Sequence, residues 1–168
     1  AHIPIVRVDF SGAVFLAFLV WDTCHYLGNA RVYAKQLPEQ LLHHVACASM
    51  VLLNRDHIWL NYAFPVLYVG ELSSIFLNGR LVYRELGWRE TWVSISFAGS
   101  FFVSRVLMLG ALVLHMGSQL GELRSILSPP LQLSYFVLLP ALYCLNVFWF
   151  VKIARTAYKV LLLGKKDA

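Results

Sequence analysis

The stretch LLHHVACASMVLLN, residues 41–54, begins an apolar run with two adjacent histidines, His43 and His44. Its surroundings are also apolar, because 59% of the 168 residues are hydrophobic and only 14% are charged. A soluble domain of this length carries about 25% charged residues. The composition therefore indicates a membrane protein, in which the two histidines are polar residues within a membrane-spanning helix.

Five apolar blocks follow one another along the chain. They lie at residues 10–27, 40–53, 58–78, 91–114 and 131–153. A helix that crosses a bilayer needs about 20 residues, which four of the blocks provide. The shorter block holds the two histidines, and a short span is tolerated where it is buried among other helices. We therefore predict an all-α, polytopic transmembrane helical bundle of about five spans, forming one domain over residues 1–168.

The connection between the second and third blocks is only NRDH, residues 54–57. Such a short link predicts a tight antiparallel hairpin of two helices.

In the five-span arrangement, three basic residues fall on one side of the membrane and ten on the other, while Arg105 lies within the fourth span. The positive-inside rule then predicts that the C-terminus faces the cytosol or an organelle matrix, with the N-terminus opposite.

The net charge of +5 indicates contact with anionic lipid headgroups. We do not expect the basic residues to gather with aromatic residues on one folded surface, so we expect no nucleic-acid partner. Cys24, Cys47 and Cys144 form an odd, scattered set without a CxxC motif. This pattern predicts small packing residues inside the bundle and no disulfide framework.

Polar residues recur inside four of the predicted spans. Ionisable groups in lipid are costly and usually face the interior of a bundle. Helical spacing places several of them on common faces, so we expect them to line one polar interior or cavity. The predicted lining residues are Asp22, Tyr26, His43, His44, Cys47, Glu71, Ser74, Asn78 and Arg105. Arg105 needs an acidic partner, and we favour Glu71 slightly over Asp22.

The paired histidines have three interpretations. The two residues form an interior hydrogen-bonding pair, take part directly in chemistry or substrate contact, or bind a metal ion. The metal interpretation is the weakest, because neighbouring residues on a helix point about 100° apart. His43 and Cys47 have helical spacing for two metal ligands, but no second pair is evident, so we predict no metal site.

The order of motifs resembles the TLC domain, the membrane domain shared by ceramide synthases and translocating-chain-associating membrane proteins. The matching motifs are Asp22-x-x-x-Tyr26, LLHH at 41–44, GELSSIFLN at 70–78 and FFVSRV at 101–106. The closest resemblance is to small TLC-domain proteins with a Glu-Leu-Ser-Ser motif. Family members have at least six spans, so the resemblance implies that an N-terminal helix is missing, replaced or not included here.

The resemblance also implies candidate catalytic residues. In ceramide synthases the paired histidines belong to the acyl-transfer site, and His43 and His44 match them. Glu71 matches the first acidic residue that those enzymes use on the following helix. Ser74 and Asn78 stand where further acidic residues would be, and their lack of a carboxylate argues against acyl transfer.

Three functions are compatible with these residues. The first is lipid binding or sensing in a polar-lined intramembrane cavity. The second is an accessory or structural subunit of a large membrane complex. The third is an acyltransferase that uses acyl-CoA, with Glu71 orienting a histidine. We rank the enzyme last and expect no cofactor unless that function holds. Expected partners are membrane lipids and other membrane subunits. The family resemblance implies the ER membrane, and an organelle inner membrane fits the charge pattern equally well.

Overall fold

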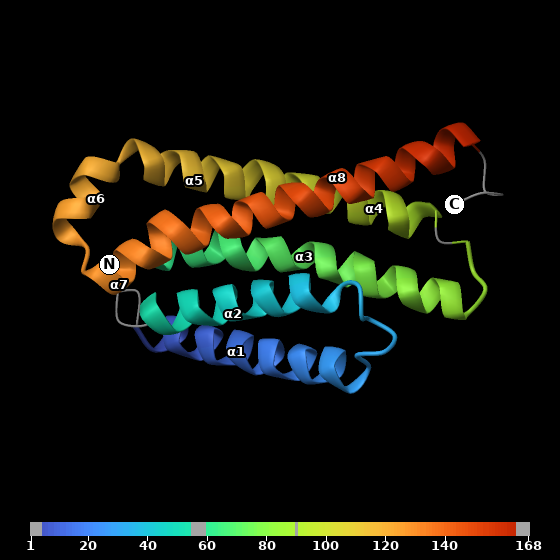
Figure 1. The fold of residues 1–168 in the computed structure, drawn as a ribbon, viewed down its shortest axis with the longest axis horizontal. Coiled ribbons are helices and arrows are strands. Elements are labelled where there is room, and N and C mark those ends of the chain that lie inside the picture. The colour runs from blue at the N-terminus through green and yellow to red at the C-terminus, as the bar shows by residue number, and fades with distance from the viewer. Residues whose placement is uncertain (1–4, 55–59, 90, 164–168) are drawn as a thin grey trace. The chain divides into compact units, whose positions relative to one another are not determined.

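The structure, a computed structural model, describes residues 5–54, 60–89 and 91–163. Helices account for nearly all of these residues, and no strand occurs among them. The predicted all-α class is therefore confirmed. Figure 1 shows the ribbon with its helices labelled in chain order.

The helices follow the five predicted blocks. They are α1 (Ile5–Gly28), α2 (Leu37–Asn54), α3 (Leu60–Glu85), α4 (Thr91–Phe101), the π-helical η1 (Phe102–Met108), α5 (Leu109–Ser118), α6 (Leu120–Ile126), α7 (Pro129–Leu133), the π-helical η2 (Ser134–Leu138) and α8 (Leu139–Leu163). Each predicted block is largely helical. The predicted hairpin link at 54–57 lies mostly outside the described residues.

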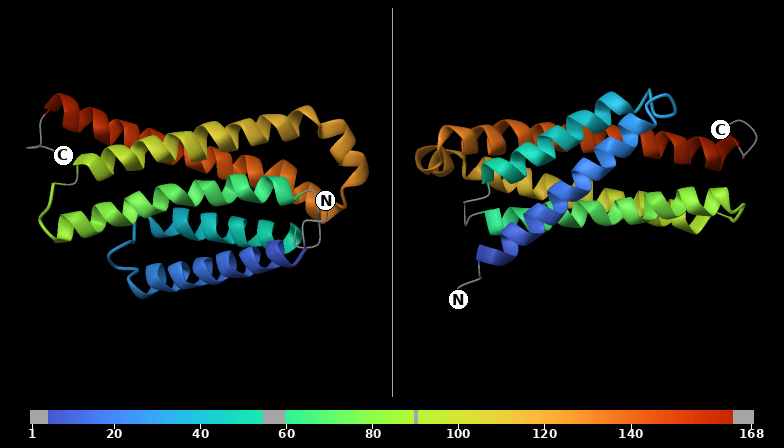
Figure 2. Two further views of the ribbon diagram at one scale, coloured as in Figure 1. Left: turned by 180° about the vertical axis from the view of Figure 1, so that it is seen from behind. Right: turned by 90° about the horizontal axis from the view of Figure 1, so that it is seen from below.

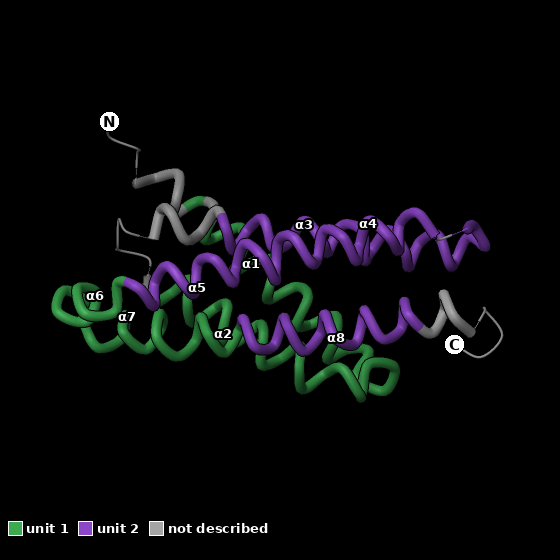
Figure 3. Tube along the Cα trace, turned by 90° about the horizontal axis from the view of Figure 1, so that it is seen from above, with its two compact units in different colours: residues 1–61, 119–142 green, residues 62–118, 143–168 purple. Residues whose placement is uncertain are grey.

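The chain divides into two compact units, which Figure 3 draws in different colours. Unit 1 comprises residues 1–61 and 119–142, and unit 2 comprises residues 62–118 and 143–168. The expectation of one TLC-type domain over the whole chain stays a prediction.

In unit 1, α1 and α2 run antiparallel and pack against each other (Figure 1). The side-chain amide of Asn29 donates a hydrogen bond to the His25 carbonyl, 2.9 Å away, and so binds a carbonyl in the last turn of α1. Pro38 lies in the first turn of α2, where a missing N–H costs nothing. Leu19 of α1 and Met50 of α2 are among the most buried apolar side chains of this unit.

In unit 2, α3 ends with Gly87 in the left-handed region, at φ +69°. The N–H of Gly87 and the N–H of Trp88 donate to carbonyls in the last turn of α3, as in a glycine-terminated helix. Close helix contacts occur where side chains are small. A Cβ atom added to Gly79 would lie 3.4 Å from Val93, and one added to Gly110 would lie 3.0 Å from the Tyr143 hydroxyl.

Two long helices continue through π-helical turns. The helix that contains α4, η1 and α5 runs without a break, as Figure 2 shows. The second joins α7, η2 and α8. There, Pro140 has no N–H to donate to the carbonyl of Phe136, and the π-helical turn lies at this point.

Among the described residues, the helices Thr91–Ser118 and Pro129–Tyr158 are long and apolar enough to cross a membrane. The segment Gly12–Gly28 is a shorter apolar helix. The number of five spans therefore stays a prediction. In the sequence LSPPL, residues 127–131, α6 has ended at Ile126 and α7 begins at Pro129 after an extended Ser128.

Three expectations need correction. Helix α3 continues to Glu85, past the predicted end of the third block at residue 78, so Arg80 and Arg84 lie on a helix and not in a connection between spans. The connection between the fourth and fifth predicted blocks, residues 115–130, contains the helix α6. Cys24 of α1 and Cys144 of α8 are exposed, so they are not packing residues within the chain; no disulfide occurs among the described residues.

Candidate functional site

Both adjacent histidines of α2 are buried. His43 is 7% exposed and His44 is 6% exposed. Their rings lie 5.8 Å apart between centroids, inclined at 54°. Because successive residues on a helix point about 100° apart, each ring has its own set of neighbours.

His44 connects α2 to α1 through both ring nitrogens. Its Nε2 atom lies 3.1 Å from Oδ2 of Asp22, and its Nδ1 atom lies 2.8 Å from the hydroxyl of Thr23. The Asp22 carboxylate is an acceptor, so in neutral His44 the proton resides on Nε2 and the Thr23 hydroxyl donates to Nδ1. The two hydrogen bonds fix the orientation of the imidazole.

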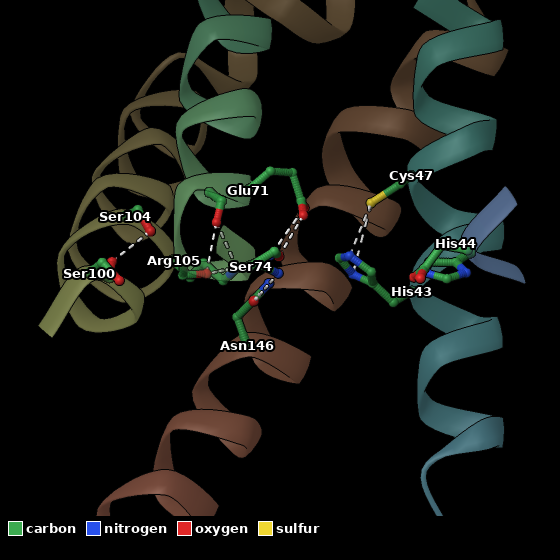
Figure 4. A network of polar contacts seen from close by, with 12 residues as sticks. His43, His44, Cys47, Glu71, Ser74, Ser100, Ser104, Arg105 and Asn146 are labelled. Atoms are coloured by element: carbon green, nitrogen blue, oxygen red, sulfur yellow. Dashed lines mark hydrogen bonds and ion pairs between the residues drawn. The ribbon is translucent and has the colours of Figure 1, made fainter. Parts of the chain in front are cut away.

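His43 contacts Cys47 one helical turn further along α2. The Cys47 sulfur lies 3.8 Å from both Nδ1 and Nε2 of His43, as Figure 4 shows. A thiol is a weak hydrogen-bonding group, so this contact is mainly one of packing. No group of three metal-ligating side chains occurs in the part of the chain that the structure describes.

Tyr26 lies beside this arrangement. Its ring is 6.2 Å from the ring of His44, in an edge-on orientation, and 4.9 Å from the ring of Tyr33. Asp22 and Tyr26 share a face of α1, as their spacing predicted. We call Asp22, Thr23, His43, His44 and Cys47 the histidine cluster; all five belong to unit 1.

A second group of polar contacts surrounds Arg105 in unit 2. Arg105 is 7% exposed and lies in the π-helical turn η1. Its Nη2 atom lies 3.0 Å from Oε1 of Glu71. The predicted choice of Glu71 as the acidic partner of Arg105 is therefore confirmed.

Neutral groups complete the environment of the guanidinium. Nε donates to the Gly70 carbonyl and to the Ser73 hydroxyl, each 2.9 Å away. Nη2 also donates to Ser74 at 3.2 Å, and Nη1 donates to Oδ1 of Asn146 at 3.3 Å (Figure 4). A buried ion that is paired and hydrogen-bonded in this way is tolerated, whereas an unpaired one is not.

The cluster joins three helices of unit 2. We call Gly70, Glu71, Ser73, Ser74, Arg105 and Asn146 the arginine cluster. Ser74 also donates to Oε2 of Glu71, at 2.9 Å, so each carboxylate oxygen has a partner. The opposite charges of Glu71 and Arg105 neutralise each other, and the guanidinium also lies 5.4 Å from the ring centre of Phe101.

Eight of the nine predicted lining residues therefore fall into two groups, and Asn78 belongs to neither. Asp22, Tyr26, His43, His44 and Cys47 lie together, and Glu71, Ser74 and Arg105 lie together. Asn78 is exposed, two turns along α3 from Glu71. A cavity lined by all nine stays a prediction.

Sequence reasoning missed three residues of these clusters. Thr23 follows Asp22 directly, but its partner His44 is 21 residues away on another helix, which spacing along α1 does not indicate. Ser73 is absent from the predicted lining residues, yet it is 1% exposed and its hydroxyl accepts a hydrogen bond from Arg105. Asn146 is an isolated amide in an apolar helix, which was the available signal that it needs a buried partner.

A family model matches nearly the whole chain. It is described as the TLC domain and covers residues 4–155. No curated protein and no solved structure matches the chain.

Proposed function

Because the chain belongs to the TLC-domain family and is a membrane protein, we propose that it binds a lipid at the histidine cluster. A TLC domain suggests a membrane protein with a lipid-related function. The site and the mode of binding are inferred from the polar groups of this chain.

The observation that supports the histidine cluster is the unused capacity of Asp22. Its side chain is 24% exposed, and among the described residues only its Oδ2 atom has a partner, His44. A carboxylate has two oxygens and about four acceptor positions. Asp22 therefore has acceptors to offer to a lipid headgroup.

The arginine cluster is less suited to a ligand. Both oxygens of Glu71 are engaged, and each nitrogen of Arg105 has an acceptor. A ligand there would have to displace existing charge-assisted bonds, which are about twice as strong as neutral ones. We propose that this cluster has a structural role.

Lipid retention tests this proposal. The protein is purified in a mild detergent, and native mass spectrometry records the masses that it keeps as activation is increased. We expect one lipid of defined mass on the wild type, and its loss from His44→Ala. The matched control is His115→Ala, which changes an exposed histidine of α5. If the wild type and both variants retain only an undefined lipid mixture, the proposal is wrong.

Acyl transfer is the second candidate, favoured by the contacts of His44. A hydroxyl, an imidazole and a carboxylate in sequence form the arrangement in which the imidazole removes a proton from the hydroxyl. Here the carboxylate in contact with His44 is Asp22, whereas the sequence suggested Glu71 for this role. A lipid hydroxyl or amine in place of the Thr23 hydroxyl would be deprotonated by Nδ1 of His44.

An acyl-CoA would supply the acyl group in this second function. The lipid oxygen or nitrogen bonds to the thioester carbonyl carbon, the carbon–sulfur bond breaks, and the proton passes through His44 to the departing thiolate. Transfer of a labelled acyl group to lipid by the wild type, absent in His44→Ala, would support the enzyme. Equal transfer by a variant with both His43→Ala and His44→Ala would exclude this mechanism.

The remaining candidate is an accessory subunit of a membrane complex. The same mass spectrum tests it, because further subunits would appear as additional mass. For location we propose the ER membrane or an organelle inner membrane, with the C-terminus in the cytosol or matrix.

A further inference from the structure

We propose that Asp22, with Tyr26 and the turn after α1, forms a site for the ammonium group of a zwitterionic phospholipid. This inference rests on the proposed function and names the class of lipid. Its first basis is charge. In neutral His44 the Nε2–H group donates to Asp22, so the pair keeps the full negative charge of the carboxylate. In a partly buried site that charge favours a cationic ligand group.

The ring of Tyr26 lies 6.2 Å from the ring of His44, the partner of Asp22, and Tyr33 lies beside Tyr26. The rings of Tyr26 and Tyr33 are 4.9 Å apart between centroids and inclined at 59°, so they contact each other without stacking in parallel. Both side chains are half-buried and so keep exposed surface. A cation within about 6 Å of such a ring centre is attracted by its π electrons, and quaternary ammonium groups are recognised in this way.

The position along α1 fits a headgroup. Asp22 is six residues before the end of α1 at Gly28, which corresponds to about 9 Å along the helix axis. Tyr33 lies in the following turn, together with the exposed residues Arg31 and Lys35. Their charges suit the phosphate of a headgroup whose ammonium contacts Asp22.

Hydrogen bonds hold this turn in a defined shape. The N–H of Tyr33 donates to the Asn29 carbonyl at 3.1 Å, and the N–H of Leu37 donates to the Tyr33 carbonyl at 2.9 Å. The N–H and the carbonyl of Tyr33 are therefore both hydrogen-bonded where the chain passes from α1 to α2. A pre-formed site loses less conformational entropy when it binds a ligand.

The opposing charges determine which headgroups fit. A zwitterionic headgroup offers an ammonium to Asp22 and a phosphate to Arg31 or Lys35. A phosphatidylglycerol headgroup has the phosphate alone and brings a negative charge towards Asp22. The structure therefore favours phosphatidylcholine or phosphatidylethanolamine over phosphatidylglycerol.

The test measures binding of short-chain phosphatidylcholine, phosphatidylethanolamine and phosphatidylglycerol to the full chain in detergent. We expect either zwitterionic lipid to bind about 10-fold or more tightly than phosphatidylglycerol, the ratio that corresponds to one charge-assisted contact. Asp22→Asn should abolish most of this preference. Tyr33→Leu should weaken phosphatidylcholine by about 3-fold to 30-fold, whereas Tyr33→Phe, which keeps the ring, should not.

The outcomes separate this inference from the proposed function. Equal binding of all three lipids, or a preference for phosphatidylglycerol, would overturn the inference and leave lipid binding standing. Phosphatidylcholine affinity unchanged in Tyr33→Leu would also overturn it. Tight binding of soluble phosphocholine without acyl chains would contradict a lipid ligand. If no lipid binds to the wild type, the proposed function itself is wrong.

Discussion

The Nε2 atom of His44 lies 3.1 Å from Oδ2 of Asp22, so that a carboxylate of α1 orients an imidazole of α2. The hydroxyl of Thr23 lies 2.8 Å from the other ring nitrogen. The acceptor, Asp22, and the donor, Thr23, are adjacent residues on α1. The side chain of Asp22 is also 24% exposed, which lets the same carboxylate meet a ligand.

The Thr23 hydroxyl is expected to stabilise this arrangement. Thr23→Val keeps the shape of the side chain but leaves Nδ1 of His44 without its donor. Loss of one partner in a buried hydrogen bond costs about 1–3 kcal/mol of the free energy of unfolding. Unfolding in mixed detergent micelles measures the difference. Thr23→Ser keeps the hydroxyl, so it should lose less than Thr23→Val, and an equal loss in both variants would contradict the hydrogen bond.

The ion pair between Glu71 and Arg105 is expected to be important for the stability of unit 2. Glu71→Ala leaves the buried guanidinium without its counter-charge. Removal of one partner from a buried pair costs about 3–5 kcal/mol, and the 25% exposure of Glu71 makes the lower end the expected value. The comparison is with Asn78→Ala, an exposed position on the same helix, which should change stability little. Similar unfolding of these two variants would show that the pair contributes nothing.

A close contact between α5 and α8 predicts different effects at two glycines. A Cβ atom at Gly110 would lie 3.0 Å from the Tyr143 hydroxyl and 3.1 Å from its ring, whereas one at Gly99 meets nothing within 4 Å. Alanine is favoured over glycine in a helix by about 1 kcal/mol. Gly99→Ala should therefore be neutral or stabilising. Gly110→Ala should be less stable than Gly99→Ala by about 1–3 kcal/mol, the usual cost of overpacking.

Thermal unfolding of both glycine variants, in the same detergent, gives this comparison directly. If Gly110→Ala gains as much stability as Gly99→Ala, then Tyr143 can move aside and the contact is not restrictive.

The five-span arrangement predicts a specific topology. The turn at residues 29–36 and the C-terminus should face the same side, opposite to the N-terminus. Single cysteines introduced at Lys35 and at Arg155, in a chain with its native cysteines replaced, can be labelled with a membrane-impermeant maleimide. Both should react from the same side of sealed membranes. Labelling from opposite sides would exclude five spans.

The sequence allowed much of the helical structure to be predicted. Apolar blocks of sufficient length determine where helices form, and an arginine within such a block requires an acidic partner. Two carboxylates within the spans, Glu71 and Asp22, were therefore candidates, and the slight preference for Glu71 is confirmed. Motif order also identified the TLC family, which the family match over residues 4–155 confirms.

Other features depend on geometry that periodicity does not encode. Asn146 of α8 contacts Arg105, 41 residues away on another helix, so helical spacing could not identify this pair. Thr23 was missed for a similar reason. Its partner His44 is 21 residues away, and only the packing of α1 against α2 brings the two side chains together.

The most direct test of lipid binding at the histidine cluster is photo-crosslinking followed by peptide mapping. The protein is incubated with a phospholipid that carries a diazirine near its headgroup, then irradiated, digested and analysed by mass spectrometry. We predict that labelled peptides concentrate in α1 and α2 around Asp22 and His44, and that Asp22→Asn lowers this labelling while Asn78→Ala does not. Equal labelling along all helices, unchanged by Asp22→Asn, would contradict a lipid site at this cluster.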